Sequence, residues 1–248
     1  MTLAGAVVVT GAAQGIGAAI AQACSEGGAA VGLLDIADCA QTAATLGGPH
    51  HVVTIDLRDA AAIPAAIAEC AAELGPISGL VNNAAVLHEA SLVATTEEQW
   101  AETIDVNLTA AWRLTAAVVP QMLDQGKGAI VNISSIEAHN VRADHAPYVA
   151  AKAGLIALTK AIAIEYGRRG IRANSISPGS IATDMFENYV QRVDDPDAFR
   201  SQLIGMNYRG RLGTVAEIAA ATVFLLSDAS GFTNGTDLVI DGGRISAT

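Results

Sequence analysis

Tyr148 and Lys152 are four residues apart in a stretch of sequence that has a helical pattern. Because residues at this spacing project from the same face of a helix, the ammonium group of Lys152 can lie beside the phenol of Tyr148. A neighbouring cation favours the phenolate, so we expect the pKa of Tyr148 to lie below its ordinary value. Such a phenol can give or accept a proton in a reaction. The same pair also occurs on ordinary solvated helices, so it is not specific by itself.

Two serines at the end of a predicted strand add to this pair. Ser135 lies thirteen residues before Tyr148, and its hydroxyl could hydrogen-bond a substrate oxygen as charge develops there. Ser134 is the alternative. Since neighbouring residues of a strand point to opposite faces, only one of the two serines can reach a substrate.

A glycine-rich segment, Thr10 to Gly17, follows a predicted strand and precedes a predicted helix. Glycine lets the backbone approach a pyrophosphate closely, and the N-terminus of the helix aims its amide donors at negative charge. The next predicted strand ends at Asp35, 18 residues beyond Gly17, where a carboxylate can accept hydrogen bonds from ribose hydroxyls. The pattern predicts a dinucleotide-binding site, and a glycine-rich turn without a ligand is the alternative.

The charge at Asp35 predicts which dinucleotide is bound. Its carboxylate would face the 2′-phosphate of NADP, and like charges in contact repel each other strongly. The sequence has no Arg or Lys at positions 12–14 or 36–38 to offset this repulsion. We therefore expect NAD as the cofactor.

The composition narrows the class of protein. The 248 residues are 51% hydrophobic, and 25 acidic against 14 basic side chains give a formal net charge of -11. No basic face is apparent, so we expect neither nucleic acid nor an anionic membrane as a partner. Cys24, Cys39 and Cys70 form no metal-binding pattern with the histidines and are typical of reduced thiols in a cytoplasmic protein; we predict no metal site. Glycines interrupt the uncharged first 25 residues, which argues against a membrane span or signal peptide.

Short β-branched runs alternate with alanine-rich helical stretches through most of the chain. This rhythm predicts a doubly wound Rossmann fold of the α/β class, with a seven-stranded parallel sheet and helices on both faces. The predicted strands are 6–9, 29–34, 51–55, 77–82, 129–133, 172–176 and 238–240, and the predicted helices are 16–26, 60–74, 97–123, 148–166 and 215–226. We expect one domain over residues 1–248. An insertion at about 180–211, without a strand pattern, is expected to act as a lid rather than as a surface excursion.

The order of these motifs resembles the short-chain dehydrogenase/reductase family, in its single-domain branch of about this length, over nearly the whole chain. The segment Thr10 to Gly17 resembles the cofactor loop of the family, whose spacing also selects Ser135 over Ser134. Further matches are Asp56-Leu57, Asn82-Asn83-Ala84-Ala85, Asn107, Tyr148 with Lys152, Pro178-Gly179 with Ile181 and Thr183, and Asp241-Gly242-Gly243. Two departures, Ala85 in place of glycine and Thr233-Asn234-Gly235 in place of a more usual T-G, remove no catalytic group.

The resemblance implies an NAD-dependent oxidoreductase that moves a hydride between nicotinamide and the carbinol or carbonyl carbon of a small alcohol or ketone. Its catalytic residues would be Asn107, Ser135, Tyr148 and Lys152, with Tyr148 as the acid/base and Asn107 holding a water that links Lys152 to solvent. The charge of oxidised nicotinamide would join Lys152 in lowering the pKa of Tyr148. The residues implied to bind the cofactor are Gly11, Gln14, Gly15, Ile16, Gly17, Asp35, Asp56, Leu57, Asn83, Ala84, Ala85, Tyr148, Lys152, Pro178, Gly179, Ile181 and Thr183. The family is commonly tetrameric, so we expect a homotetramer.

Polar side chains near the predicted acid/base are candidates for substrate binding. We assign Glu137, His145 and Tyr189 to a small substrate that is polar or hydroxylated. Loop capping or solvent exposure explains Glu137 and His145 equally well. Two other functions remain open. One is an NAD-binding regulatory protein without turnover, which would not need the serine, tyrosine and lysine together. The other is an epimerase or dehydratase with transient oxidation, whose relatives usually carry a larger C-terminal substrate domain.

Overall fold

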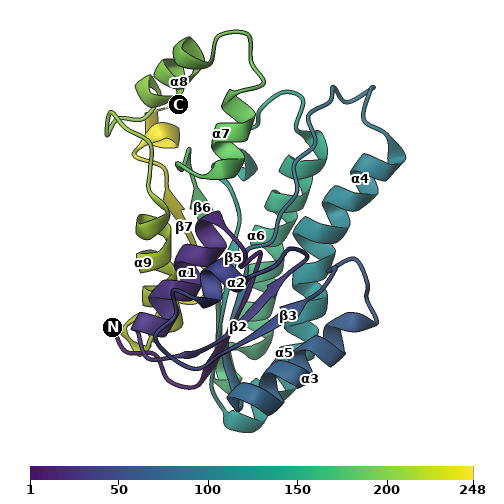
Figure 1. Ribbon diagram of the computed structural model, residues 1–248, viewed down its shortest axis with the longest axis vertical. Coiled ribbons are helices and arrows are strands. Elements are labelled where there is room, and N and C mark those ends of the chain that lie inside the picture. The colour runs from purple at the N-terminus through teal and green to yellow at the C-terminus, as the bar shows by residue number, and fades with distance from the viewer. Residues whose placement is uncertain (248) are drawn as a thin grey trace.

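Seven parallel strands form one sheet in the computed structural model, in the order β3-β2-β1-β4-β5-β6-β7 (Figure 1). The structure describes residues 1–247, apart from the side chains at 184, 185, 189 and 247. The strands are β1 (Ala6–Thr10), β2 (Ala30–Asp35), β3 (His50–Thr54), β4 (Ile77–Asn82), β5 (Gly128–Ile133), β6 (Ile171–Pro178) and β7 (Asp237–Ile240). Every predicted strand overlaps its observed counterpart, and the predicted fold class is confirmed.

The strand order explains where a ligand can enter. The chain runs outward from β1 to β3 and then returns to β4 on the other side of β1. β1 is buried along its whole length, as expected for a parallel strand that is covered on both faces. The loops after β1 and β4 leave the sheet in different directions, and the crevice between them is where doubly wound folds bind ligands.

Helices cover both faces of the sheet (Figure 1). One face carries α1 (Gly15–Glu26), α2 (Ala40–Ala43) and α9 (Val215–Leu226), and the other carries α3 (Ala62–Leu74), α4 (Glu97–Ile104), α5 (Ala110–Gln125) and α6 (Ala146–Tyr166). Each face has its own apolar core, with Ile20 and Ile218 in the first and Ile67 and Leu114 in the second. The two cores hold the carboxyl ends of the strands in a fixed arrangement.

The helix predicted over 97–123 is divided in the structure. A π-helical turn, η1 (Asp105–Thr109), separates α4 from α5. Such turns widen one turn of a helix and occur frequently at functional sites. This one carries Asn107, whose side-chain amide binds the backbone of Val86 through both its oxygen and its nitrogen.

The segment predicted as an insertion contains two short helices, α7 (Asp184–Val190) and α8 (Pro196–Gly205). Asp195 caps α8 by accepting a hydrogen bond of 3.0 Å from the amide of Ala198, and Pro196 occupies its first turn. In Figure 1, α7 and α8 lie beyond the carboxyl ends of the strands, beside the C-terminal turn η5 (Arg244–Ala247). The insertion therefore lies at the end of the sheet where the crevice opens.

The helix that begins with α6 is long and apolar enough to cross a membrane by length and composition alone. It packs against β6 and against α4, and nearly half of its apolar window is buried within the protein. Core helices of globular proteins share these properties, so the length and composition of α6 are weak evidence for a membrane span.

Candidate active site

A cleft of about 770 Å³ opens at the carboxyl ends of the strands and extends from the glycine-rich loop to α8. It is lined by every residue that the sequence assigns to the cofactor except Gly17. Ser135, Glu137 and His145 also line it, whereas Asn107 does not. The side chain of Tyr189 lies outside the described residues, and its backbone belongs to α7.

The loop after β1 is closely fitted to the loop after β4. The Thr10 hydroxyl accepts hydrogen bonds from the amides of Asn83 and Ala84, at 3.0 and 3.1 Å. In return, the Asn83 side-chain amide donates to the carbonyl oxygens of Thr10 and Gly11. Gly11 has a φ of +64°, and a Cβ there would lie 2.9 Å from the Cα of Ala84. The two loops therefore form one preformed wall of the cleft, which we name the Thr10–Asn83 clamp.

The N-terminal turn of α1 is suited to a pyrophosphate. Gln14, the residue before the helix, makes no side-chain capping bond, so the first amides are available to a ligand. Asp35 at the end of β2 accepts hydrogen bonds of 2.9 Å from the amides of Ala13 and Ala37, which hold its carboxylate beside the glycine-rich loop. Helix amides for phosphates and an adjacent carboxylate for ribose hydroxyls are the groups that a dinucleotide requires. The residues present therefore fit that cofactor.

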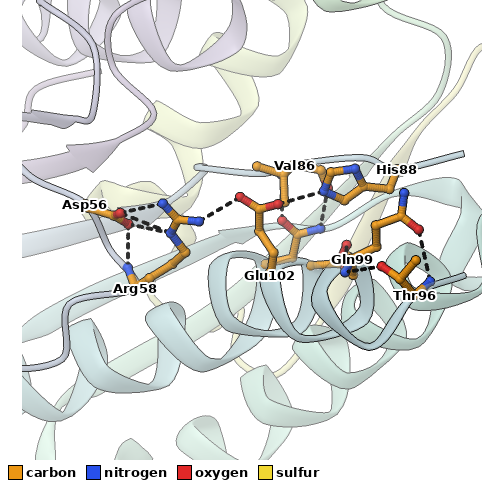
Figure 2. A network of polar contacts seen from close by, with 9 residues as sticks. Asp56, Arg58, Val86, His88, Thr96, Gln99 and Glu102 are labelled. Carbon is orange, nitrogen blue, oxygen red and sulfur yellow. Dashed lines mark hydrogen bonds and ion pairs between the residues drawn. The ribbon is translucent and has the colours of Figure 1, made fainter.

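Three charged residues that line the cleft are joined by polar contacts, namely Asp56, Arg58 and Glu102 (Figure 2). Arg58 binds both carboxylate oxygens of Asp56 and donates a hydrogen bond of 2.9 Å to Glu102, which also contacts His88 at 2.9 Å. The hydrogen bond from Arg58 lowers the pKa of the Asp56 carboxyl. Arg58 and Glu102 line the cleft, although the motif analysis did not select them. Their contact spans 44 positions of sequence, and only the proximity of Arg58 to Asp56-Leu57 could have suggested a role.

Ser135, Tyr148 and Lys152 meet at the base of the cleft. The Ser135 hydroxyl hydrogen-bonds the phenol of Tyr148 and also accepts from the amide of Glu137 at 3.1 Å. Lys152 is almost fully buried, and its Nζ donates to the carbonyl oxygen of Ile133 at 2.7 Å and lies 5.6 Å from the centre of the Tyr148 ring. The hydroxyl of Ser134 instead donates to the carbonyl oxygen of Lys152.

The titration of this group differs from the expectation that Lys152 lowers the pKa of Tyr148. Burial is the largest effect and raises the pKa of Tyr148, the charge of Glu137 raises it further, and the hydrogen bond from Ser135 lowers it. Burial also lowers the pKa of Lys152 to about 8. Without the charge of a bound cofactor, burial therefore disfavours the phenolate of Tyr148 and the ammonium of Lys152 alike.

The side chain of Asn107 is held against the backbone of the segment that follows β4, and the expected water between Asn107 and Lys152 stays a prediction. The Asn107 side-chain oxygen accepts from the amide of Val86 at 2.8 Å, and its nitrogen donates to the carbonyl of Val86 at 2.9 Å. In this arrangement Asn107 supports the segment that follows the Thr10–Asn83 clamp.

A buried histidine borders the other end of the cleft. His145 is 2% exposed, and its Nδ1 and Nε2 contact Glu137 at 2.8 Å and Glu89 at 3.4 Å. Burial alone would lower the pKa of His145, but the hydrogen bonds and charge of the carboxylates, Glu137 foremost, outweigh it and raise the pKa. Its ring lies edge-on to Tyr148, with 6.4 Å between the ring centres. His139, in contrast, contacts the carboxylate of Asp237 at 2.7 Å and does not line the cleft.

Comparison with known proteins accounts for this arrangement. The family model described as enoyl-(acyl carrier protein) reductase, one of the short-chain dehydrogenase/reductase models, matches residues 11–244. The chain belongs to the short-chain dehydrogenase/reductase family. It is 41% identical over 243 residues to the D-threitol dehydrogenase of Mycolicibacterium smegmatis, a match that covers 95% of this chain and 91% of that protein.

Solved structures of the short-chain dehydrogenase/reductase family have the same fold. Levodione reductase superposes with a TM-score of 0.95 at 30% identity, over 100% of both chains. A proposed 2-deoxy-D-gluconate 3-dehydrogenase from Agrobacterium tumefaciens, with bound NADP, superposes with a TM-score of 0.91 at 32% identity, over 98% of this chain and 97% of that one. The family therefore uses a nicotinamide cofactor, which is NADP in that solved structure.

Proposed function

We propose that this short-chain dehydrogenase/reductase oxidises a secondary alcohol of a small polyhydroxylated substrate, or reduces the corresponding ketone, with NAD as cofactor and Tyr148 as the acid/base. The observation that carries the proposal is that Ser135, Tyr148 and Lys152 line the same cleft as the glycine-rich loop and Asp35. A protein that only bound the dinucleotide would require the loop and Asp35 but not the other three side chains.

The chemistry follows from the positions of these side chains. In the direction of oxidation, the phenolate of Tyr148 accepts the hydroxyl proton of the substrate, while the Ser135 hydroxyl hydrogen-bonds the same oxygen. When bound, NAD accepts the hydride from the carbinol carbon, so that the substrate leaves as a ketone. Lys152 is buried beside the phenol of Tyr148. When the amine of Lys152 is protonated, its positive charge stabilises the phenolate. Reduction uses the same groups in the reverse order.

Asp35 supports NAD in preference to NADP. Its carboxylate is held in place by the amides of Ala13 and Ala37 and cannot turn away from a 2′-phosphate without losing both bonds. Arg58 also lines the cleft, but its guanidinium is bound to Asp56 and Glu102. A solved relative holds NADP, so the preference of this protein for NAD over NADP has to be measured directly.

Two observations support a polyhydroxylated substrate. The cleft beyond Tyr148 is lined by hydrogen-bonding side chains, including Glu137, Asn140 and His145. Among relatives, one is a D-threitol dehydrogenase and another is a proposed 2-deoxy-D-gluconate 3-dehydrogenase. Both names describe substrates with several hydroxyl groups.

The test is a panel of sugar alcohols, sugar acids, cyclic alcohols and diketones, with NAD or NADH, followed by the absorbance of reduced nicotinamide. Stoichiometric appearance of NADH with at least one polyhydroxylated alcohol supports the proposal. Tight binding of NAD without turnover of any compound would favour the regulatory alternative. Conversion of substrate without accumulation of NADH would favour transient oxidation by an epimerase or dehydratase.

For the assembly we propose a homotetramer located in the cytoplasm. Trp100 on α4 and Trp112 on α5 are 42% and 56% exposed, which is unusual for tryptophan and is suited to burial between subunits. Light scattering coupled to gel filtration measures the mass directly. A monomer at micromolar concentration would contradict this part of the proposal.

A further inference from the structure

Glu137 lies next to the reacting groups, and its own backbone ties it to them. Its amide donates a hydrogen bond of 3.1 Å to the hydroxyl of Ser135, which in turn hydrogen-bonds the phenol of Tyr148. The Glu137 side chain is 20% exposed and lines the cleft. Its charge acts on Tyr148, whose pKa it raises. The carboxylate therefore lies close to the point where Ser135 and Tyr148 would hold the reacting oxygen.

His145 holds this carboxylate in one orientation. The imidazole Nδ1 contacts one oxygen of Glu137 at 2.8 Å, and the imidazole Nε2 contacts Glu89 at 3.4 Å. The His145 ring is 2% exposed and lies edge-on to the ring of Tyr148, with 6.4 Å between the ring centres. Because the imidazole is buried and contacted at both nitrogens, it cannot turn freely, and the Glu137 oxygen that it contacts is fixed as well.

The backbone before His145 has a conformation that favours a special position. Asp144 has a φ of +65°, and among the residues that the structure describes it is the one non-glycine residue with a positive φ. Its carbonyl oxygen accepts a hydrogen bond of 3.0 Å from the amide of Ala90, which follows Glu89. The segments that carry His145 and Glu89 are therefore joined beside the cleft. Such backbone conformations are concentrated at binding and active sites.

The second carboxylate oxygen of Glu137 has no hydrogen-bond donor within the described part of the chain. An ionised carboxylate only accepts hydrogen bonds, so a ligand has to supply the donor. A hydroxyl group can supply one, whereas a carbonyl group cannot. Two carboxylates share the imidazole of His145, so a net negative charge remains even when the ring is protonated. An anionic group on the ligand is therefore disfavoured at this position.

We propose that Glu137 binds a hydroxyl group on the carbon next to the reacting one, which makes the substrate a vicinal diol or, in reduction, an α-hydroxy ketone. During oxidation the hydride of the reacting carbon passes to NAD and its hydroxyl proton passes to Tyr148. The neighbouring hydroxyl group is not consumed and keeps its hydrogen bond to Glu137, so it orients the substrate. This inference rests on the proposed function, because it names the substrate class for the same site.

The experiment compares butane-2,3-diol with butan-2-ol, which share a carbon chain and differ in the second hydroxyl group. We expect kcat/KM with NAD to be at least about 10-fold higher for the diol, because only the diol can donate a hydrogen bond to the charged carboxylate. In reduction, 3-hydroxybutan-2-one and butane-2,3-dione differ at the same position. Ligand-observed NMR measures the binding of both alcohols to the NADH-loaded protein, in which their oxidation cannot proceed.

Glu137→Gln keeps the shape of the side chain, but its amide accepts hydrogen bonds more weakly and can also donate them. This variant should reduce the preference for the diol about 5-fold or more and should raise the efficiency with the dione relative to the hydroxy ketone. Glu137→Asp keeps the charge but withdraws it by one methylene group, and should retain part of the preference. Each ratio compares two substrates of one variant, so a general loss of activity cancels.

Glu73→Gln is the matched control, since it removes the same charge at an exposed position of α3 outside the cleft. It should leave both ratios as they are. Thermal unfolding and the dissociation constant of NAD verify that each variant is folded. If one Glu137 variant does not fold, the other provides the comparison, and the ratio of the two alcohols in the wild type needs neither.

Equal kcat/KM for the two alcohols, or a preference unchanged in both Glu137 variants, would overturn the inference. Faster oxidation of lactate than of butane-2,3-diol would also overturn it, because the position would then accept an anion. A Glu137-dependent preference for binding the diol, without NADH from any alcohol, would contradict the proposed function while supporting the hydroxyl site. The two failures are therefore distinguishable.

Discussion

Gly17 lies directly against the backbone of Gly11, so close that a Cβ on Gly17 would be 1.9 Å from the Gly11 carbonyl oxygen. The first turn of α1 can approach the loop after β1 only because this side chain is missing. Gly17 does not line the cleft, so its contribution is to shape the cradle rather than to touch a ligand.

Gly17→Ala should therefore weaken both folding and cofactor binding. Relief of a contact with backbone atoms requires α1 to shift, and we expect a loss of at least about 3 kcal/mol in the free energy of unfolding. Urea denaturation measures this loss. Gly205→Ala is the control, since a Cβ there meets nothing within 4 Å, and it should change stability little. A Gly17→Ala variant as stable as the wild type, with normal NAD affinity, would contradict this account of the loop.

Asp35 should determine the choice of cofactor. We expect the wild type to prefer NAD over NADP by ~100-fold or more in kcat/KM, because a fixed carboxylate faces the 2′-phosphate. Replacing Asp35 with Ser and Ile36 with Arg should shift the preference toward NADP. Steady-state kinetics with both cofactors provide the measurement, and equal efficiency of the wild type with NAD and NADP is incompatible with the prediction.

Tyr148→Phe should abolish most turnover while leaving the fold intact, since it removes one oxygen and keeps the ring. We expect kcat to fall at least ~100-fold with little change in the dissociation constant of NAD. Tyr166→Phe, at the far end of the same helix, is the matched control.

The pH profile provides an independent test of the same residue. Oxidation requires the phenolate, and burial raises the pKa of Tyr148 in the cofactor-free protein, so the rate of oxidation should rise with pH. Bound oxidised nicotinamide adds positive charge and should bring the apparent pKa well below the ordinary value of tyrosine. A Tyr148→Phe enzyme with the wild-type profile would mean that another group accepts the proton.

His145 should make the stability of the protein depend on pH. Its pKa is raised in the folded state, so its ion pairs with Glu137 and Glu89 stabilise the fold below its unfolded pKa, and this stabilisation is lost as pH rises through the folded value. The stability difference between wild type and His145→Gln should therefore be larger at pH ~5 than at pH ~9. Urea denaturation at both values tests this, with the exposed His50→Gln as control. A difference that grows with pH has the wrong sign for this explanation.

Much of the fold can be predicted from short stretches of sequence, because each strand, turn and helix has its own pattern of residue types. The β-branched runs of β1 and β5 are buried on both faces, and the glycines and the Asp35 carboxylate follow the strands at fixed distances. Tyr148 and Lys152 lie on the same face of α6 because they are four residues apart, so the helical period alone predicts that they are neighbours. These features need no knowledge of contacts between distant segments.

Features that depend on distant contacts were not predicted. The bond between Arg58 and Glu102 spans 44 positions, and that between Arg244 and Ser180 spans 64. Asn107 in the π-helical turn binds the backbone of Val86, which is 21 residues away. Burial of Tyr148 likewise reversed the expected shift of its pKa, since burial is a property of the assembled fold.

The Thr10–Asn83 clamp has a thermodynamic consequence for ligand association. Its hydrogen bonds join the loops after β1 and β4 before any dinucleotide arrives, so the backbone of this wall loses its conformational freedom when the chain folds. Association then requires no further ordering of these loops. The measured enthalpy and entropy of association at this wall should therefore reflect contacts with the dinucleotide and released water rather than a disorder-to-order transition of the protein.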